Sequence, residues 1–472
     1  MSTAQPQQVV VVGAGMAGLA AAEALLRRSP RPEVTLIEPS GRVGGVVGTI
    51  RDGDWLVERS ADNVLVARPE AIDMVRRLGL EEELVSIPTE RRRALVWHRG
   101  RGVPAPQGFR LLAPGRFDGI LTTPLLSLRG RLRLLAEPLV RRGSGGDESL
   151  ESFAVRRLGR EAFARLVQPL AAGIWTADPA RLGMEAACPE FLEMERTNGS
   201  LWAGERSRLR RGGGASSATG ARYGQFVALA SGMETLPRRL AARLTAEGGR
   251  FLTDAVTSLD RMGTGWRVEL ASGDQRQADA VVVAAPASVA SRILGGIDRS
   301  LAADLAAIEY AGSAVVGLGY RRDQIGHPLD AAGMVVPRTA GRRALAVSFS
   351  SQKFPDRAPP GCVLVRVFIG GALDPGVLDL SDAALTRLAR EEVGVLIAAR
   401  GEPLIERLER WHGAMPQYHV GHLDRVARIE AAVARHAGLG LAGAAYRGVG
   451  IPQVIASGQA AAAAVSRPFE RA

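Results

Sequence analysis

Val-Val-Val-Val-Gly-Ala-Gly-Met-Ala-Gly, residues 9–18, determines how the rest of the sequence is interpreted. The β-branched run predicts a short buried strand, and the alanine-rich residues 16–28 predict a helix directly after it. Gly13, Gly15 and Gly18 stand between them in the order G-x-G-x-x-G. The first glycine makes a tight turn, the second lets the backbone approach a diphosphate, and the third lets helix and strand pack closely. The stretch therefore predicts a dinucleotide site with the diphosphate at the helix amino end.

A second predicted strand, residues 33–37, ends at Glu38, twenty residues beyond Gly18. The spacing fits a βαβ unit with a helical crossover. A carboxylate at this place can accept hydrogen bonds from a ribose, and it disfavours a 2′-phosphate. A glycine turn without a ligand is the alternative, but the four features together favour the dinucleotide. Since FAD and NAD share this pattern, further residues must decide between them.

The composition is that of an ordinary globular protein. The chain has 472 residues, with 46% hydrophobic and 23% charged residues. Because this length exceeds what one core usually organises, we expect two or three domains.

The net charge of +11 is concentrated in one region. Residues 91–142 contain twelve arginines but only Asp118 and Glu137 as acids, and Lys353 is the only lysine of the chain. Such a region is either a solvated face, a guide for an anionic substrate, or a docking face for a membrane or another protein. Nucleic acid is disfavoured because no basic stripe interleaved with aromatic residues is present.

Two cysteines, Cys188 and Cys362, stand far apart and suggest neither a disulfide framework nor a zinc site. Residues 1–8 lack the basic and apolar pattern of a secretory signal, and no run of eighteen apolar residues occurs. We therefore expect a cytoplasmic protein whose contact with a membrane, if it has one, is peripheral.

The order of predicted elements indicates three structural parts, of which two are discontinuous. The end of the chain returns to the style of its beginning, with an apolar strand, a turn of small residues and an alanine-rich helix. The predicted parts are a dinucleotide-binding domain (1–75, 225–295 and 410–472), a substrate-binding domain (76–105 and 296–409) and a helical, arginine-rich subdomain (106–224).

Arg42, Gly44 and Gly45 resemble the segment E-x-x-x-R-x-G-G of the flavin amine oxidase and protoporphyrinogen oxidase superfamily. Other strings are similar to those of the coproporphyrinogen III oxidases of Gram-positive bacteria, sisters of the protoporphyrinogen IX oxidases. These strings are Arg410-Trp411-His412, Met415-Pro416-Gln417-Tyr418-His419-Val420-Gly421-His422, Gly443-Ala444, Gly448-Val449-Gly450-Ile451-Pro452, Gln168-Pro169-Leu170, Gly173-Ile174 and Gly232-Met233-Glu234-Thr235-Leu236. The resemblance spans essentially the whole chain.

The resemblance implies one FAD, held non-covalently, in an α/β fold with α+β insertions. A Rossmann-like FAD-binding domain would be joined to a mixed-sheet substrate domain and to the helical subdomain. The residues implied to contact FAD are Gly13, Ala14, Gly15, Met16, Ala17, Gly18, Glu38, Pro39, Arg42, Gly44, Gly45, Val46, Ser60, Ala61, Asp62, Asn63, Val256, Trp411, Gly443, Val449, Ile451, Pro452 and Gln453. A helix beginning at the last of these turns would stabilise negative charge on the reduced flavin.

The reaction implied is the six-electron oxidation of a porphyrinogen in haem biosynthesis, with dioxygen as acceptor and hydrogen peroxide as product. The string around Tyr418 favours coproporphyrinogen III, and protoporphyrinogen IX is the alternative. The next enzyme of the haem pathway is a candidate partner. Substrate contacts are expected at Arg59, Arg68, Gly173, Ile174 and Gly333, where the arginines would meet propionates.

No catalytic side chain and no metal are expected, because the macrocycle can release its own protons. His412, His419 and His422 lie within eleven residues, but no cysteine or carboxylate cluster completes a metal site around them.

The chain departs from the family at two places. Ser60 and Ala61 stand where relatives have Gly-Pro, and residues 175–177 replace a commoner Tyr/Phe-Ala-Gly. The change beside the flavin keeps open a different class of function, a flavin-binding or haem-pathway interaction protein without turnover. An amine oxidase or a carotenoid desaturase on the same scaffold is a further alternative, although Lys353 follows no amine oxidase motif.

Overall fold

The computed structural model describes residues 6–143, 145–210 and 226–466. The end of the predicted helical subdomain, from residue 211 on, lies outside the described residues. Among those that are described, no helix combines the length and the apolar character needed to cross a lipid bilayer.

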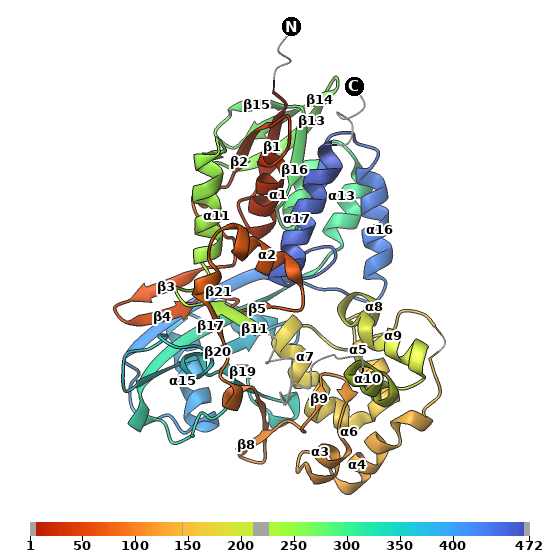
Figure 1. Cartoon of the computed structure of the whole chain (residues 1–472), viewed down its shortest axis with the longest axis vertical. Coiled ribbons are helices and arrows are strands. Elements are labelled where there is room, and N and C mark those ends of the chain that lie inside the picture. The colour runs from red at the N-terminus through yellow and green to blue at the C-terminus, as the bar shows by residue number, and fades with distance from the viewer. Residues whose placement is uncertain (1–5, 144, 211–225, 467–472) are drawn as a thin grey trace.

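A five-stranded parallel sheet forms the part of the molecule near the two termini (Figure 1). Its strands, in spatial order, are β12 (Arg250–Leu252), β2 (Glu33–Ile37), β1 (Gln8–Val12), β16 (Ala280–Val283) and β22 (Leu439–Leu441). Numbered along the chain, this order is 3-2-1-4-5, the arrangement of the Rossmann fold. The predicted α/β class is confirmed.

Alternate residues of β1 enter two different cores, as expected for a strand buried on both faces. Val9 and Val11 pack with α1 (Met16–Leu26), α11 (Thr235–Ala246) and α17 (Ile451–Ser466). On the other face lie α12 (Ala287–Leu294), α13 (Arg299–Ala306), α16 (His422–Val433) and the meander of β13 (Val256–Met262), β14 (Gly265–Leu270) and β15 (Gln275–Ala278).

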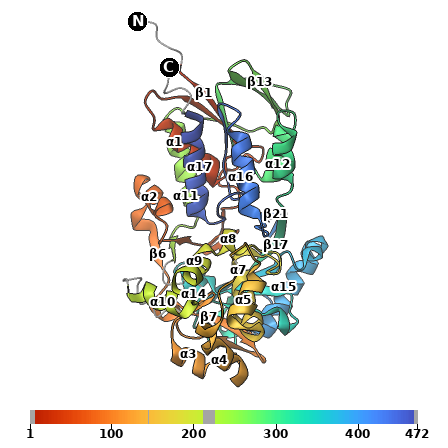
Figure 2. The same ribbon diagram turned by 90° about the vertical axis from the view of Figure 1, so that its right-hand side faces the viewer.

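Helices α1 and α17 come from opposite ends of the chain but lie side by side in both views (Figures 1 and 2). A Cβ atom at Gly458 of α17 would lie 2.1 Å from the carbonyl oxygen of Ala17. Only a glycine permits this approach, and it joins the first and last segments in one layer.

A seven-stranded mixed sheet forms the second part. Its order is β21 (Ile405–Pro416), β17 (Tyr310–Arg321), β20 (Cys362–Gly370), β19 (Ala344–Ser348), β18 (Gly333–Val335), β7 (Ala94–His98) and β8 (Arg101–Pro104). Only β18 and β7 are parallel neighbours. Helix α15 (Asp382–Leu396) packs on this sheet.

The third part is helical and lies at the end of the molecule opposite the termini, with α3 and α4 outermost in both views (Figures 1 and 2). Its elements are β9 (Phe109–Arg110), β10 (Ala113–Pro114), α3 (Phe117–Thr122), α4 (Leu128–Leu135), η3 (Glu137–Leu139), α5 (Leu150–Leu158), α6 (Arg160–Ala162), η4 (Phe163–Val167), α7 (Gln168–Trp175), α8 (Met184–Ala187), α9 (Pro189–Asn198) and α10 (Leu201–Arg210).

Element boundaries differ from the sequence predictions by a few residues. The helix predicted over 16–28 ends at Leu26, where Arg27 is the C-cap. The domain boundaries stay predictions, and two elements cross them: β21 spans the boundary at 409/410, and β11 (Phe226–Leu229) joins β5 (Val64–Leu65) to β6 (Leu84–Ser86) across 75/76.

Candidate functional site

The glycine turn after β1 is shaped by close backbone contacts. Gly13 has a φ of +98°, and a Cβ there would lie 2.7 Å from the carbonyl oxygen of Ala284. A Cβ at Gly18 would lie 1.9 Å from the carbonyl oxygen of Gly13. At Gly15 the nearest atom would be the Cα of Gly45, at 3.9 Å. Gly13 and Gly18 are therefore required by the fold, whereas a Cβ at Gly15 would make only an ordinary contact with Gly45, which leaves Gly15 free to lie against a diphosphate.

The amino end of α1 is open to an anion. Gly15 is the N-cap, and no side chain among the described residues caps the helix or adds an acid to its first turn. The first N–H groups of a helix have no partner within it, and its dipole favours negative charge there. Met16, Ala17 and Gly18 present these amides, so the residues predicted to hold a diphosphate are assembled at one place.

Glu38 lies next to this turn at the end of β2. One carboxylate oxygen accepts the backbone N–H of Ala14 at 3.0 Å, and the other accepts the hydroxyl of Ser40 at 2.7 Å. Pro39 beside it is exposed. The carboxylate is thereby held in a fixed position in which a ribose hydroxyl could approach it.

A cavity of about 220 Å³ opens beside Glu38. It is lined by Ala14, Glu38, Gly41, Arg42, Val43, Ala241, Ala242, Thr245, Phe251, Leu252 and Thr253. Its walls from α11 and β12 are mainly apolar, which suits a planar base attached to the ribose. Sequence reasoning missed these walls, because their residues carry no motif and come from two hundred positions further along the chain.

Arg42 organises the next turn. Its guanidinium donates to the carbonyl oxygens of Val47, at 3.2 Å, and of Gly45. Burial and the nearby charge of Arg59 lower the pKa of Arg42. Gly44 donates its N–H to the carbonyl oxygen of Ala14 at 2.8 Å, so this turn is fastened directly to the glycine turn.

The loop of Arg59 to Asn63 is held from several sides despite its departure from the family. The Ser60 hydroxyl donates to the carbonyl oxygen of Val46 at 2.7 Å, and the indole N–H of Trp411 donates to the carbonyl oxygen of Arg59 at 3.0 Å. Ala61 is half-buried, and Asn63 donates its side-chain amide to Asp62. The structure thus brings Val46, Trp411 and this loop together, as predicted for a flavin site.

Beneath the loop lies a buried ion cluster that the sequence did not predict. Asp62 pairs with the Lys353 ammonium at 2.7 Å and with the Arg366 guanidinium at 2.5 Å. The two cations hold the pKa of Asp62 well below its usual range, even though burial acts in the opposite direction. Burial also lowers the pKa of Lys353. The only available signal was the single lysine in an arginine-rich sequence.

The turn before α17 is the second predicted contact region. Gly443 donates its N–H to the hydroxyl of Ser457 at 3.0 Å, and Gly448 donates to the hydroxyl of Tyr418 at 2.8 Å. The Tyr418 hydroxyl in turn donates to the carbonyl oxygen of Ala444 at 2.5 Å. Val449, Ile451, Pro452 and Gln453 follow, and α17 begins on the same edge of the parallel sheet as α1. Two helix amino ends therefore face the edge at which ligands bind in such sheets.

Tyr418 fastens this turn, and its loss should be measurable. Tyr418→Phe leaves the Gly448 N–H without its acceptor, so we expect the free energy of unfolding to fall by about 1–2 kcal/mol and flavin affinity to fall by roughly tenfold. Thermal unfolding and fluorescence titration with the flavin measure the two effects. Tyr446→Phe is the matched control, because the buried Tyr446 hydroxyl has no hydrogen-bond partner among the described residues. Equal effects of the two variants would contradict the role of the Tyr418 hydroxyl in holding this turn.

The residues predicted to contact substrate lie in other elements. Gly173 and Ile174 are exposed near the end of α7, and a Cβ on Gly173 would come within 3.9 Å of Val335 of β18. Gly333, also in β18, is buried, and a Cβ there would lie 2.7 Å from the carbonyl oxygen of Val347. These positions are brought into one neighbourhood, but Gly333 is constrained by strand packing rather than by open space.

The two predicted propionate contacts differ. Arg59 pairs with Glu409 at 2.7 Å and lies over the Trp411 ring, 5.6 Å from its centroid. Its buried Nε has no partner among the described residues. Arg68 is exposed at the start of α2 (Pro69–Arg77). Both roles stay predictions.

Several residues singled out in the sequence do not come together in one site. Val256 starts β13, three residues after the cavity residue Thr253. His412 is exposed, His419 lies 3.2 Å from an Arg181 nitrogen, and His422 is buried against Tyr446, where burial lowers its pKa to about 4. Within the described ranges, no group of three histidine, cysteine or acidic side chains is placed to hold a metal.

The site fits a dinucleotide on structural grounds. The uncapped amides of α1 follow directly after Ala14, and Ala14 both donates its N–H to the Glu38 carboxylate and lines the cavity with it. The Nε of Arg59 is a further buried donor without a partner among the described residues, and such donors ordinarily have an acceptor.

Comparison with known proteins identifies the family. The model of the family described as flavin containing amine oxidoreductase matches residues 16–466. The chain is 32% identical to the coproporphyrinogen III oxidase of Bacillus subtilis (strain 168), over 96% of this chain and 97% of that protein. It is 30% identical to the chloroplastic protoporphyrinogen oxidase 1 of Arabidopsis thaliana, over 88% of this chain and 79% of that protein.

Solved structures agree. A protein from Exiguobacterium sp. 255-15, provisionally assigned as a protoporphyrinogen oxidase, superposes with a TM-score of 0.86 at 27% identity, covering 99% of this chain and all of that one. Cyclohexylamine oxidase from Brevibacterium oxydans IH-35A shares the fold, with a TM-score of 0.69 at 17% identity and coverage of 99% and 100%. The chain therefore belongs to the family of flavin-containing amine oxidoreductases, enzymes that use a flavin as their redox cofactor.

Proposed function

We propose that this protein binds one FAD non-covalently and oxidises coproporphyrinogen III to coproporphyrin III, with dioxygen as electron acceptor. The observation that carries the proposal is the uncapped amino end of α1 beside Ala14, which donates its N–H to the Glu38 carboxylate and lines the cavity together with it. Similarity to the Bacillus subtilis coproporphyrinogen III oxidase over nearly the whole of both chains supports the substrate class.

The bound flavin would supply hydride acceptance and electron transfer to dioxygen. The balance is six electrons and six protons lost by the porphyrinogen, with three dioxygen molecules reduced to three hydrogen peroxide molecules. The chain's own residues bind and orient: Glu38 would hold the ribose, the α1 amides the diphosphate, and the Arg59–Asn63 loop and the turn before α17 the ring. Positioning of this kind can supply much of a rate enhancement without a side-chain acid or base.

Anaerobic mixing tests the proposal directly. We expect coproporphyrinogen III to bleach the yellow of the bound flavin, and porphyrin fluorescence to accumulate once air is admitted. Persistent oxidised flavin in the presence of the porphyrinogen would contradict the enzyme and favour a flavin-binding protein without turnover. Protoporphyrinogen IX in the same assay tests the alternative substrate, and a primary amine tests an amine oxidase.

Several arginines of the basic region, residues 91–142, are paired with acidic side chains. Arg93 pairs with Asp330, Arg110 with Glu190 and Glu205, and Arg116 with Asp118. Steering of an anionic substrate by the remaining exposed arginines would make kcat/KM fall with ionic strength, since salt screens exposed charges.

We further propose that the outer end of the helical part contacts an anionic membrane surface. Leu128 and Leu132 lie one turn apart on α4 and are 71% and 56% exposed, and Leu121 and Leu139 nearby are 52% and 86% exposed. Arg129 beside them is exposed as well. Apolar side chains next to cations suit a peripheral contact with anionic lipid.

Vesicle flotation tests this contact. We expect the protein to float with vesicles rich in anionic lipid and not with neutral ones, and the double variant Leu128→Glu with Leu132→Glu to lose binding. Leu404→Glu is the control, because Leu404 is similarly exposed, at 51%, in another part of the molecule. Failure of the unaltered protein to bind anionic vesicles would contradict the proposal, and would leave the next haem-pathway enzyme as the candidate partner of this surface.

A further inference from the structure

Five ionisable side chains are buried together around the Arg59–Asn63 loop. Their exposed fractions are 3% for Glu58, 8% for Asp62, 5% for Lys353, and 1% each for Arg357 and Arg366. They come from β4 (Trp55–Glu58), the loop itself, α14 (Ser350–Lys353) with the segment after it, and β20. The cluster therefore joins the hairpin before the loop to the seven-stranded sheet.

Positive charges outnumber negative ones in this cluster. Asp62 is shared by Lys353 and Arg366, at 2.7 and 2.5 Å. The Glu58 carboxylate accepts hydrogen bonds from two neutral donors, the Thr49 hydroxyl at 2.7 Å and the Met233 N–H at 2.9 Å, and burial raises its pKa.

Arg357 donates to the backbone carbonyl oxygens of Leu229, at 2.8 Å, and Ala230, at 2.7 Å. Glu234, a further buried carboxylate close by, has its own cation in Arg238 at 3.0 Å. Three cations thus face two carboxylates. Excess buried charge is costly unless an opposite charge compensates it, so an anion near this cluster would be stabilised.

Arg366 also fixes the backbone of the loop. Its guanidinium donates to the carbonyl oxygens of Glu58, at 3.0 Å, and Ser60, at 2.6 Å. Ser60 in turn bonds to Val46 at 2.7 Å. Val46 follows the turn that Gly44 fastens to Ala14, so hydrogen bonds connect the cluster to the turn beside the cavity at Glu38.

The cation at position 353 is an ammonium in a chain whose other basic residues are arginines. Of sixty basic residues in the chain, Lys353 is the only lysine. A compact ammonium on a flexible stem concentrates its charge at one point, whereas a guanidinium spreads its charge over a planar fork with five donors that all need partners.

We propose that Lys353, together with Arg366 and Asp62, positions the flavin-ring loop and leaves one positive charge that stabilises the negative charge which the ring gains on reduction. Lys353 is a positioning residue in this proposal, acting through the loop and through its field. The inference rests on the FAD site proposed above and names a group that sets the properties of the bound cofactor.

The test compares the affinities for oxidised and reduced FAD in full-length Lys353→Met, Lys353→Arg and unaltered protein, titrated in air and anaerobically with reductant. In Lys353→Met the affinity for reduced FAD should fall about tenfold more than that for oxidised FAD, which for a two-electron couple equals a shift of about 30 mV to lower potential. Lys353→Arg should recover most of this difference, and Asp62→Asn should shift the potential in the opposite direction.

Arg157→Met is the control for nonspecific destabilisation, because it removes a fully buried cation from the remote helical part. It should lower stability without changing the ratio of the two affinities. Equal weakening of both oxidation states in Lys353→Met would overturn this inference alone, since a purely structural lysine gives that result. Unaltered protein that binds no FAD would overturn the proposed function together with it.

Discussion

Gly15→Val is expected to abolish FAD binding while the protein still folds. Gly15 has φ −69° and ψ 176°, a conformation open to any residue, and a Cβ there would lie 3.9 Å from the Cα of Gly45. The added side chain would occupy the space through which the diphosphate approaches the α1 amides. Loss of these contacts should reduce FAD affinity by at least roughly a hundredfold, the equivalent of about 3 kcal/mol.

Two neighbouring variants sharpen the result. Gly15→Ala adds a single methyl group and should give an intermediate loss of affinity. Gly18→Ala should instead impair folding, because its Cβ would lie 1.9 Å from the Gly13 carbonyl oxygen. Circular dichroism and thermal unfolding of the cofactor-free proteins, with FAD titration, separate the two classes. Unchanged FAD affinity in Gly15→Val would place the diphosphate elsewhere.

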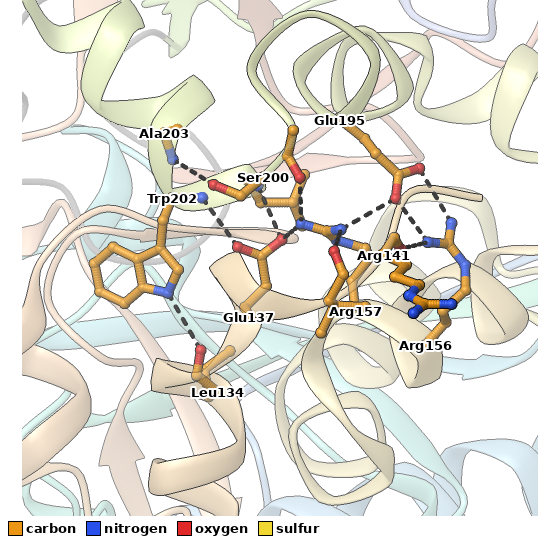
Figure 3. Close-up of polar contacts among 12 residues, drawn as sticks. Leu134, Glu137, Arg141, Arg156, Arg157, Glu195, Ser200, Trp202 and Ala203 are labelled. Atoms are coloured by element: carbon orange, nitrogen blue, oxygen red, sulfur yellow. Dashed lines mark hydrogen bonds and ion pairs between the residues drawn. The ribbon is translucent and has the colours of Figure 1, made fainter.

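Arg157→Met should lower the free energy of unfolding strongly. Arg157 is fully buried in the helical part and pairs with Glu137 and, at 3.2 Å, with Glu195 (Figure 3). It also donates to the carbonyl oxygens of Val140, at 3.0 Å, and Gly199, at 3.2 Å. Removing the cation leaves the wholly buried Glu137 carboxylate without its charge partner, which should cost about 3–5 kcal/mol.

Glu137 also binds the amino end of the helix that follows, α10. It accepts the backbone N–H of Leu201 at 2.9 Å, at the first residue of α10. Adding Glu137→Gln to Arg157→Met should recover part of the lost free energy of unfolding, because a neutral amide costs less to bury without a partner.

Urea unfolding measures the stability of both variants. Arg196→Met is the control, since its pair with Glu193 is exposed and should contribute less than about 1 kcal/mol. A similarly small loss of stability in Arg157→Met would show that the pairs of Arg157 with Glu137 and Glu195 do not stabilise the fold.

Residues close together in the sequence made the cofactor region predictable. The glycine turn, Glu38 and the Arg42 segment form within one βαβ unit, where local spacing dictates geometry. The similarity of residues 410–452 to porphyrinogen oxidases was also readable, and the family assignment is confirmed by the match over residues 16–466. The substrate contacts and all of the FAD contacts, including those at the glycine turn, stay predictions.

Features built from distant segments could not be predicted in this way. The cavity beside Glu38 needs α11 and β12, and the ion cluster sets Lys353 and Arg366 under Asp62, about three hundred residues away in the chain. Arg157 and Lys353 look like ordinary basic residues in the sequence, because burial and pairing depend on which surfaces close over them.

The parallel βαβ unit, the glycine turn and the family could be inferred from the order of residues alone, since periodicity, glycine spacing and local strings act over a few residues. The folded arrangement was needed to see which arginines are paired, which carboxylates are buried and where excess positive charge remains. The physical reason is that an ionisable group's energy depends on desolvation and on charges within a few ångströms, and those neighbours are set by folding rather than by position along the chain.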